Sequence, residues 1–377
     1  MNNSKKIFIL AGEASGDLHA SELVKNIKDR DNEIKFSGIG GNHLKSEGVE
    51  LIYDYNHINY IGFFSIIKYY FSIKKYFNTA VQNIRTINPE VIILVDFPGF
   101  NLKICKEIRK FFKGKIIYYI SPQLWAWHKS RVKIIRKYVD KMLVIFPFEV
   151  DFYKNEGIDA SFVGHPLIKR LSRFQHRTDT EPGKPQISVL PGSRKEEIKF
   201  MLPVLSETAK QLSEKYGAKI KIICAANIDI GFLKSIIPGS DFDFVKVSEN
   251  NETINYETII NSDLVISKSG TSTLECCLLE TPFCVVYKTN YFNYFIGKSL
   301  IKVKFLSIVN ILAGKEIVKE FLQKDFNAKN LLDEVAQLIV DKEYRDNMIK
   351  EFRNIKKSLS KINITKDASE IICDLMK

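Results

Sequence analysis

Short apolar runs alternate with longer stretches of helical periodicity along most of the chain. The first series of runs is Ile7–Ala11, Ile34–Gly38, Val91–Val95, Ile116–Ile120, Met142–Phe146 and Ser161–Val163. The second series is Ile187–Leu190, Ile220–Cys224, Phe244–Val247, Leu264–Ser267 and Phe283–Tyr287. Runs that are apolar on both faces and separated by helices are typical of strands in a covered parallel sheet. The pattern predicts an α/β fold with two Rossmann-like domains facing one another across a cleft.

The break between the two series predicts the domain boundaries. Residues 169–186 show no periodicity and contain several Arg, Pro and Gly residues, which is typical of a linker. We therefore expect an N-terminal domain over 1–168, a C-terminal domain over 187–345 and a helical tail over 346–377. Because ligands of such sheets bind at the carboxyl ends of the strands, the loops after the strands are the candidate sites.

Composition narrows the possible partners. The chain of 377 residues has a formal charge of +12, with 26 Phe and 16 Tyr, which suits nucleic acid, an anionic membrane surface or phosphorylated small molecules. It carries no RNA-binding motif signature, so we expect no nucleic-acid partner. The six cysteines form no C-x-x-C pair, and no signal peptide or membrane-spanning window is visible. We expect a cytoplasmic protein whose membrane contact, if any, is peripheral.

The turn Pro191-Gly192-Ser193-Arg194 joins an apolar strand to a helical pattern. Unpaired N–H groups at a helix start attract an anion, and the planar guanidinium of Arg194 can bind two phosphate oxygens. The turn therefore predicts a diphosphate site. An ordinary strand-to-helix turn with a surface arginine is the alternative.

A second glycine-bearing helix start lies in the same half of the chain, at Ser269-Gly270-Thr271. Its N–H groups and hydroxyls suit phosphate or ribose oxygens. Glu275 follows one turn later, where its carboxylate could accept both ribose hydroxyls. Helix capping, with a glutamate paired to a nearby lysine, is the alternative. Two such loops in one domain favour nucleotide binding.

Two acidic residues follow apolar strands in the first half. Asp96 comes directly after Val91–Val95, where a carboxylate is well placed to act as a general base. Glu13 holds the corresponding place after the first strand and is the rival candidate. A turn aspartate before Pro-Gly is the structural alternative for Asp96.

Other motifs are less specific. The glycines of 38–41 lack the spacing of a dinucleotide fingerprint, so we reject NAD binding. Asp241 and Asp243 follow Pro-Gly and indicate a surface turn, and the histidines lack zinc spacing, so we expect no metal site. His165 either reaches the cleft or packs as a hinge residue.

Residues 60–77 and 291–305 mix aromatic, aliphatic and lysine residues in a way that suits a helix on anionic lipid. A core helix with outward lysines is the alternative. For the first segment we favour lipid contact; for the second both interpretations stay open. The expected contact residues are Phe63, Phe64, Ile66, Ile67, Lys68, Tyr70 and Lys74.

Several blocks, in order, resemble the lipid-A-disaccharide synthase family. They are Gly12-Glu13-Ala14-Ser15-Gly16-Asp17, Asp96-Phe97-Pro98-Gly99-Phe100-Asn101, Ser121-Pro122-Gln123-Leu124-Trp125-Ala126-Trp127, Phe162-Val163-Gly164-His165-Pro166, Leu190-Pro191-Gly192-Ser193-Arg194, Ser269-Gly270-Thr271 with Leu274-Glu275-Cys276, and Val309-Asn310-Ile311-Leu312-Ala313-Gly314. The resemblance runs from about Ile7 to about Leu322. It implies a GT-B glycosyltransferase that needs no bound metal or cofactor.

The resemblance also implies a reaction. It would join UDP-2,3-diacylglucosamine to 2,3-diacylglucosamine 1-phosphate, invert the anomeric centre and release UDP, at a membrane surface. A polyprenyl-linked glycosyltransferase or a UDP-sugar epimerase of the same fold is the alternative, against which the tryptophan loop and the Asp96 block argue. In this family the C-terminal part can be exchanged between two subunits, so a homodimer is one expectation.

The resemblance assigns roles to residues. Asp96 would deprotonate the acceptor 6-hydroxyl, with Glu13 as the rival, and Arg194 would bind the diphosphate. Asn310 matches a position implicated in activity. The further substrate-binding residues expected are Gly192, Ser193, Ser269, Gly270, Thr271, Glu275, Gln123, Trp125 and His165.

Overall fold

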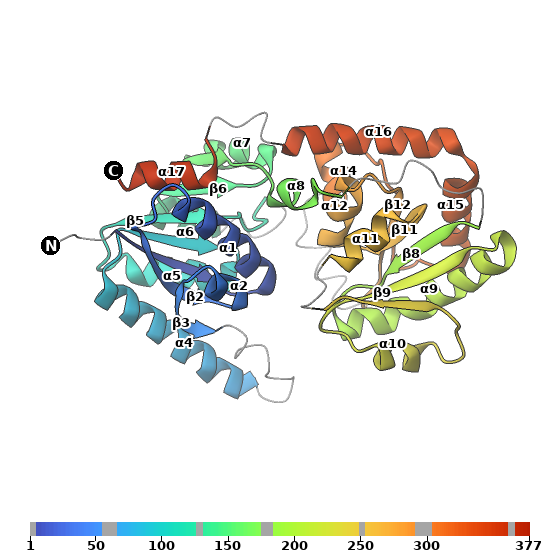
Figure 1. Ribbon diagram of the computed structural model, residues 1–377, viewed down its shortest axis with the longest axis horizontal. Helices are drawn as coiled ribbons and strands as arrows, with labels where there is room; N and C mark the ends of the chain where they lie inside the picture. Colours follow the sequence, from blue (N-terminus) through green and yellow to red (C-terminus); the bar gives the residue numbers. More distant parts are fainter. Residues whose placement is uncertain are drawn as a thin grey trace. The chain divides into compact units, whose positions relative to one another are not determined.

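The first unit of the structure is built on a seven-stranded parallel sheet with the order β3-β2-β1-β4-β5-β6-β7 (Figure 1). The computed structural model describes residues 5–54, 66–125, 131–174, 184–248, 253–290, 304–360 and 366–377. The strands are β1 (Lys6–Ala11), β2 (Lys35–Gly40), β3 (Glu50–Asp54), β4 (Val91–Val95), β5 (Lys115–Tyr119), β6 (Lys141–Val144) and β7 (Ala160–Phe162). The helices are α1 (Ala14–Lys28), α2 (Asn42–Ser46), α4 (Ile66–Ile87), α5 (Pro98–Ile108), α6 (Val132–Tyr138), α7 (Pro147–Asn155) and α17 (Ala368–Leu375).

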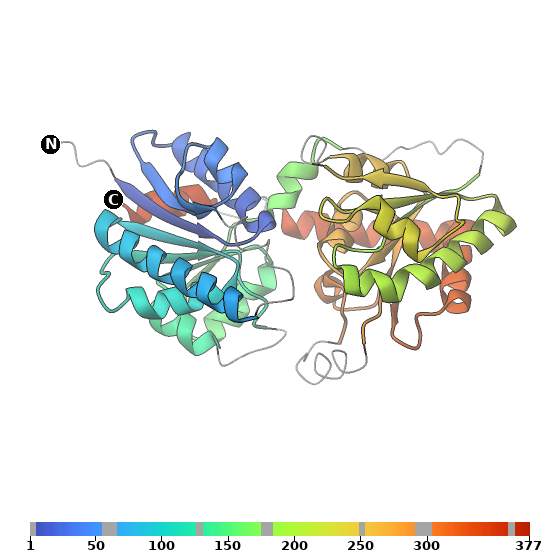
Figure 2. The same ribbon diagram turned by 90° about the horizontal axis from the view of Figure 1, so that it is seen from below.

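The second unit is built on a six-stranded parallel sheet with the order β10-β9-β8-β11-β12-β13. Its strands are β8 (Gln186–Leu190), β9 (Lys219–Cys224), β10 (Asp243–Lys246), β11 (Leu264–Lys268), β12 (Phe283–Tyr287) and β13 (Glu320–Leu322). Its helices are α8 (Pro166–Leu171), α9 (Lys195–Tyr216), α10 (Ile230–Ile236), α11 (Ile254–Ile260), α12 (Thr271–Leu278), α14 (Ile308–Ala313), α15 (Ala328–Val340) and α16 (Lys342–Leu359). In each unit helices cover both faces of the sheet (Figure 2).

The predicted α/β class and the parallel sheets are confirmed. Each predicted apolar run forms a strand, and the central strands β1 and β4 are buried along both faces, since burial is what demands an apolar residue at every position. The sequence pattern missed β3 and β13. Both lie at sheet edges and their apolar runs are short, since Glu50 and Asp54 bound that of β3 and Glu320 opens β13.

The chain divides into its two units at places that differ from the expected boundaries. One unit comprises Met1–Pro166 with Lys361–Lys377, and the other comprises Leu167–Ser360. Within the expected tail, α16 packs on α12 and α14 of the second unit, whereas α17 packs on α1 of the first. The segment 346–377 is therefore not one element, because its two helices bury their apolar faces against different sheets.

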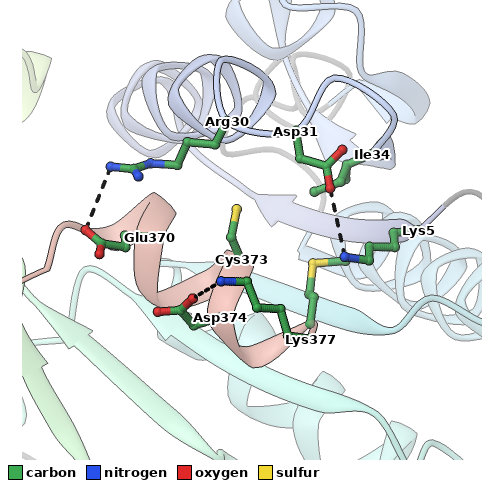
Figure 3. A pocket seen from close by; sticks show the side chains of 9 residues that line it. Lys5, Arg30, Asp31, Ile34, Glu370, Cys373, Asp374 and Lys377 are labelled. Carbon is green, nitrogen blue, oxygen red and sulfur yellow. Dashed lines mark hydrogen bonds and ion pairs between the residues drawn. The ribbon is translucent and has the colours of Figure 1, made fainter.

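A pocket of about 280 Å³ lies between α17 and the amino ends of β1 and β2 (Figure 3). Its charged side chains pair within the pocket: Lys5 with Asp31 at 3.9 Å, Arg30 with Glu370 at 3.9 Å, and Lys377 with Asp374 at 2.7 Å. It lies at the edge of the sheet opposite to the carboxyl ends of the strands. We assign it to the docking of α17.

Candidate functional site

Asp96 lies at the carboxyl end of β4 in a strained backbone conformation. Its φ is +44° and that of Phe97 is +45°, a region that side-chain-bearing residues rarely adopt. Neighbouring groups stabilise this turn, because the Asp96 carbonyl oxygen accepts hydrogen bonds from Asn101 Nδ2 at 2.8 Å and from the Tyr118 hydroxyl at 2.5 Å. Strain that the surrounding structure holds in place is typical of functional turns.

The pKa of the Asp96 carboxyl lies nearer to neutral pH than that of an ordinary aspartate. Burial, and to a smaller extent the nearby Glu13 carboxylate, raise this pKa to about 6 against the opposing effect of a hydrogen bond from the Phe97 N–H. A base with a pKa near the working pH is efficient, because it is both available and able to take a proton. The structure thus brings the two rival acids of the sequence, Asp96 and Glu13, into electrostatic contact.

The two acidic residues of the Gly12–Asp17 block, Glu13 and Asp17, have different roles. Glu13 is exposed at the start of α1, whereas Asp17 is buried and accepts hydrogen bonds from the N–H groups of Gly41 at 2.7 Å and His43 at 3.0 Å. A Cβ at position 12 would lie 2.3 Å from the Phe97 ring, so only glycine fits beside the Asp96 turn. Asp17 is therefore structural, and Glu13 is the acid of this block that reaches the surface.

The glycines of 38–41 have a packing explanation. A Cβ at Gly38 would lie 1.9 Å from the Ile9 carbonyl oxygen, and one at Gly40 would lie 2.3 Å from Leu44. Glycine is needed there for close approach of β1, β2 and α2, so the cluster requires no nucleotide.

The loop after β5 presents Gln123 and Trp125. Gln123 is exposed, and Trp125 is half-buried with its indole N–H donating to Glu149 Oε1 at 3.2 Å. His165, after β7, is buried with its ring centroid 5.2 Å from that of Phe146. Sequence reasoning missed Glu149. Its place at the third residue of a helix that begins with proline was the signal available.

In the second unit, the turn after β8 places Arg194 as the N-cap of α9. Gly192 has a φ of +99°, and a Cβ there would lie 3.2 Å from the Lys268 side chain, so glycine serves both conformation and packing. Ser193 accepts a hydrogen bond on its carbonyl from Asn227 Nδ2 at 2.9 Å. The Arg194 side chain is 74% exposed and donates to Glu197 Oε1 at 3.0 Å.

Glu197 links the turn after β8 to the end of β11. Its carboxylate forms an ion pair with Lys268 Nζ at 3.0 Å and accepts a 3.4 Å hydrogen bond from the Tyr287 hydroxyl. Burial acts to raise the pKa of Glu197, but the interactions with Lys268 and Arg194 outweigh it and hold that pKa below its ordinary value. The carboxylate thus stays ionised between two cations, which leaves the cluster with a net positive charge suited to an anion.

The loop after β11 places Ser269, Gly270 and Thr271 at the start of α12, with Gly270 and Thr271 exposed. Glu275 lies one turn on and accepts from the Tyr256 hydroxyl at 3.4 Å. Burial raises the pKa of Glu275 to about 7, against the opposing effects of Arg170 and the Tyr256 hydrogen bond. Glu275 therefore interacts with Arg170 and Tyr256, and not with a lysine as the capping alternative expected.

Asn310, which the resemblance connects with activity and substrate binding, lies inside the second unit. It is fully buried, its Nδ2 donates to the Val318 carbonyl and to Glu320 Oε1 at 2.8 Å each, and its Oδ1 accepts from the N–H groups of Ile317 and Val318. Glu320 in turn accepts from the N–H groups of Leu306 and Ser307. The amide is used inside the fold, where it shapes the chain around α14.

The expected membrane-contact residues lie mainly outside what the structure describes. Phe63 and Phe64 are outside the described residues, and the side chains of Ile66, Ile67, Lys68 and Tyr70, at the start of α4, are too. Lys74 is exposed. The following turns of α4 are core: Tyr76 is buried with its hydroxyl donating to the Asp54 carbonyl at 2.7 Å, and Ile73 and Phe77 pack against the core.

The described part of the chain offers neither a membrane span nor a metal-binding cluster. No helix in it is long and apolar enough to cross a membrane. No group of three or more His, Cys, Asp and Glu side chains in it could hold a metal ion. All six cysteines are free thiols.

Solved structures share the fold at low sequence identity. A UDP-GlcNAc 2-epimerase from Neisseria meningitidis has a TM-score of 0.64 at 12% identity, covering 98% of this chain and 99% of that chain. The MurG protein of Acinetobacter baumannii has a TM-score of 0.59 at 13% identity, covering 98% and 99%. These neighbours, with a calicheamicin glycosyltransferase, place the chain in the GT-B fold without distinguishing between transferases and epimerases.

Sequence relatives make that distinction. Lipid-A-disaccharide synthase 1 of Legionella pneumophila is 40% identical over 374 residues, covering 96% of this chain and 94% of the relative. Lipid-A-disaccharide synthase of Geobacter sulfurreducens is 34% identical over 382 residues, covering 100% and 98%. The family model described as lipid-A-disaccharide synthetase matches residues 7–372. With this match along nearly its whole length, the chain belongs to the lipid-A-disaccharide synthetase family of glycosyltransferases.

Proposed function

We propose that the protein condenses UDP-2,3-diacylglucosamine with 2,3-diacylglucosamine 1-phosphate to give the β-1,6 disaccharide 1-phosphate and UDP. The observation that carries this proposal is the Asp96 carboxyl, placed at a strand end with a pKa of about 6 in a chain of this family. In the reaction the acceptor 6-hydroxyl oxygen attacks the anomeric carbon of the donor. The bond to the diphosphate breaks with its electron pair leaving on UDP, and Asp96 takes the hydroxyl proton.

The second unit supplies the site for the leaving group in this proposal. Arg194 and the N–H groups at the starts of α9 and α12 would stabilise the charge that develops on the diphosphate. Gly192 and Ser193 would bring the backbone close to the phosphates, and Ser269, Gly270, Thr271 and Glu275 would contact the nucleoside. The net positive cluster of Arg194, Lys268 and Glu197 supports this assignment.

The acceptor and the membrane form the other half of the proposal. Gln123, Trp125 and His165 would line the acceptor site of the first unit. Phe63, Phe64, Ile66, Ile67 and Tyr70, with Lys68 and Lys74, would dock on the inner membrane from the cytoplasmic side, where the acylated substrates reside. If two subunits exchange their C-terminal parts, the contacts of Arg30 with Asp367 and Ser369 would form between chains.

The direct test is an assay with the two diacylated substrates in detergent, with and without a chelator. We expect disaccharide and UDP in both cases. Asp96→Asn removes the basic oxygen while keeping the shape, so turnover should fall by about 10²–10⁴-fold with UDP affinity nearly unchanged. Absence of product from folded wild-type protein would refute the proposal, and loss of UDP binding in Asp96→Asn would make Asp96 a structural residue.

A further inference from the structure

Glu149 is a buried carboxyl that none of the roles above uses. It lies in the first turn of α7, is 1% exposed, and comes from the loop after β6. Its Oε2 accepts a hydrogen bond from the Phe146 N–H at 3.2 Å, and its Oε1 accepts one from the Trp125 indole at 3.2 Å. One side chain thus joins the loop after β6 to the loop after β5.

The burial of this carboxyl is costly. No cation pairs with it among the described residues, and burial raises the pKa of Glu149 to about 8 against the hydrogen bonds from Phe146, Ser121 and Trp125. Capping α7 requires only one oxygen, and an exposed glutamate could supply it without desolvation. The contact with Trp125 therefore explains why the Glu149 side chain is buried and why its second oxygen, Oε1, also accepts a hydrogen bond.

Ring contacts extend the link to the third loop at this edge. The Trp125 ring meets Phe148 edge-on at 5.0 Å, Phe148 stacks on Phe146 at 5.8 Å, and Phe146 lies 5.2 Å from His165. The cluster therefore connects the loops after β5, β6 and β7, all at the carboxyl edge of the sheet. Loops that are interlocked in this way keep the half-buried indole in one orientation.

We propose that Glu149 is a positioning residue for acceptor binding, which orients the Trp125 indole so that the loop of residues 121–125 is preformed for the acceptor sugar. The inference rests on the proposed function. Glu149 is buried and touches no substrate itself; it acts through the indole. A preformed loop reduces the ordering cost that the acceptor must otherwise meet on binding.

The first experiment measures KM for each substrate in Glu149→Gln. A glutamine amide can accept from only one of the two N–H donors, so the indole or the helix start loses its partner. We expect the acceptor KM to rise about tenfold, as for loss of one buried hydrogen bond, with the donor KM unchanged. Glu156→Gln, at the other end of the same helix, is the matched control and should leave both unchanged.

The second experiment asks whether Glu149 acts through Trp125. Trp125→Phe keeps an aromatic ring and removes the N–H donor, so it tests the same bond from the other side. It should raise the acceptor KM similarly, and adding Glu149→Gln to it should have little further effect. Fully additive effects, or donor and acceptor KM rising equally, would overturn the proposal.

The third experiment reads the loop without substrate. The chain has two tryptophans, so Trp127→Phe leaves Trp125 as the sole indole fluorophore. In that background Glu149→Gln should shift the emission of the folded apoprotein, with circular dichroism as the check on folding. An active wild-type enzyme whose Glu149→Gln variant shows unchanged emission and unchanged acceptor KM would overturn the positioning role. An inactive folded wild type would instead refute the proposed function.

Discussion

Asp96 combines strain and burial at one position. Its left-handed backbone costs on the order of 1–3 kcal/mol, and its buried carboxyl is harder to ionise than one in water. Neither feature stabilises the fold. Hydrogen bonds from Asn101 and Tyr118 hold the turn, and Gly12 makes room for Phe97 beside it. A strained backbone and a buried carboxyl at the same strand end, both unfavourable to stability, are typical of a catalytic carboxylate.

The pH dependence of kcat/KM follows from the pKa of Asp96. A general base works deprotonated, so kcat/KM should be half-maximal at about pH 6, should approach its full value as the pH rises above that point and should fall below it. Glu13→Gln removes the charge that helps to raise this pKa, which should move the acid limb to lower pH. Because burial is the larger cause, the limb should move only part of the way to the ordinary aspartate value. The measurement is a pH–rate profile of both proteins.

Glu107→Gln is the control for that profile, since Glu107 lies on α5 and pairs with Lys110 at 2.8 Å on the surface. It should leave the acid limb in place. An acid limb at the same pH in wild type and Asp96→Asn, measured on residual activity, would show that another group is the base.

Glu197 allows binding and catalysis to be separated in the second unit. Glu197→Gln removes a negative charge beside Arg194 and Lys268, so UDP affinity should be kept or increased. The guanidinium loses its ionic anchor, so kcat should fall about tenfold as transition-state stabilisation weakens. Calorimetry with UDP and steady-state kinetics measure the two effects. Glu196→Gln, an exposed neighbour paired with Lys199, should change neither, and weaker UDP binding at unchanged kcat would contradict the argument.

At the scale of elements, α4 tests one of the two interpretations of its sequence. From Ile73 onward it is a core helix with exposed lysines, which was the alternative to lipid contact. The expected contact residues belong to its first turns and to the segment before it. If the first turns contact lipid as predicted, the position along the helix, and not its average composition, separates the two roles.

Substituting Phe63, Phe64, Ile66 and Ile67 with serine should release the protein from anionic vesicles without unfolding it, because the described core contacts of α4 are made by residues such as Ile73, Tyr76 and Phe77, which stay unchanged. Each lysine near an anionic surface contributes about 1 kcal/mol, so Lys68→Gln with Lys74→Gln should weaken binding more moderately. Vesicle co-sedimentation measures both. A large drop in Tm of the serine variant would show that these side chains are core.

At the scale of the whole molecule, the C-terminal end of the chain stabilises the N-terminal unit. Ile372 of α17 is fully buried, α17 packs on α1, and Arg30 bonds Ser369 at 2.8 Å and Asp367 at 3.0 Å. The C-terminal segment 361–377 therefore belongs to the fold of residues 1–166 and not to the unit that precedes it in sequence.

Ile372→Ala should cost about 2–5 kcal/mol of unfolding free energy, as for other buried isoleucines. Because the lost contacts lie on the first unit, hydrogen exchange should accelerate in α1 and stay unchanged in α9. Val340→Ala, a 69% exposed position on α15, is the control. Equal acceleration in α1 and α9 would mean that the two units unfold together.

The amino-acid sequence by itself determined the parallel α/β class, the places of the central strands and the loops that carry the chemistry. The physical reason is that a strand buried on both faces must be apolar at every position, and the carboxyl ends of such strands are where ligands bind. Strands at a sheet edge are less constrained, and β3 and β13, whose short apolar runs are bounded by Glu50, Asp54 or Glu320, were missed.

Only the tertiary structure decided which polar side chains are buried and hydrogen-bonded within the fold and which stay exposed. In the Gly12–Asp17 block, Asp17 accepts hydrogen bonds from backbone N–H groups, whereas Glu13 stays exposed. Elsewhere, Asn310 makes its hydrogen bonds inside the fold, and Glu149 is buried and accepts a hydrogen bond from Trp125. Each outcome depends on groups brought together from distant parts of the chain. Local sequence specifies which side chains could do chemistry, whereas burial and partners specify which of them remain able to do it.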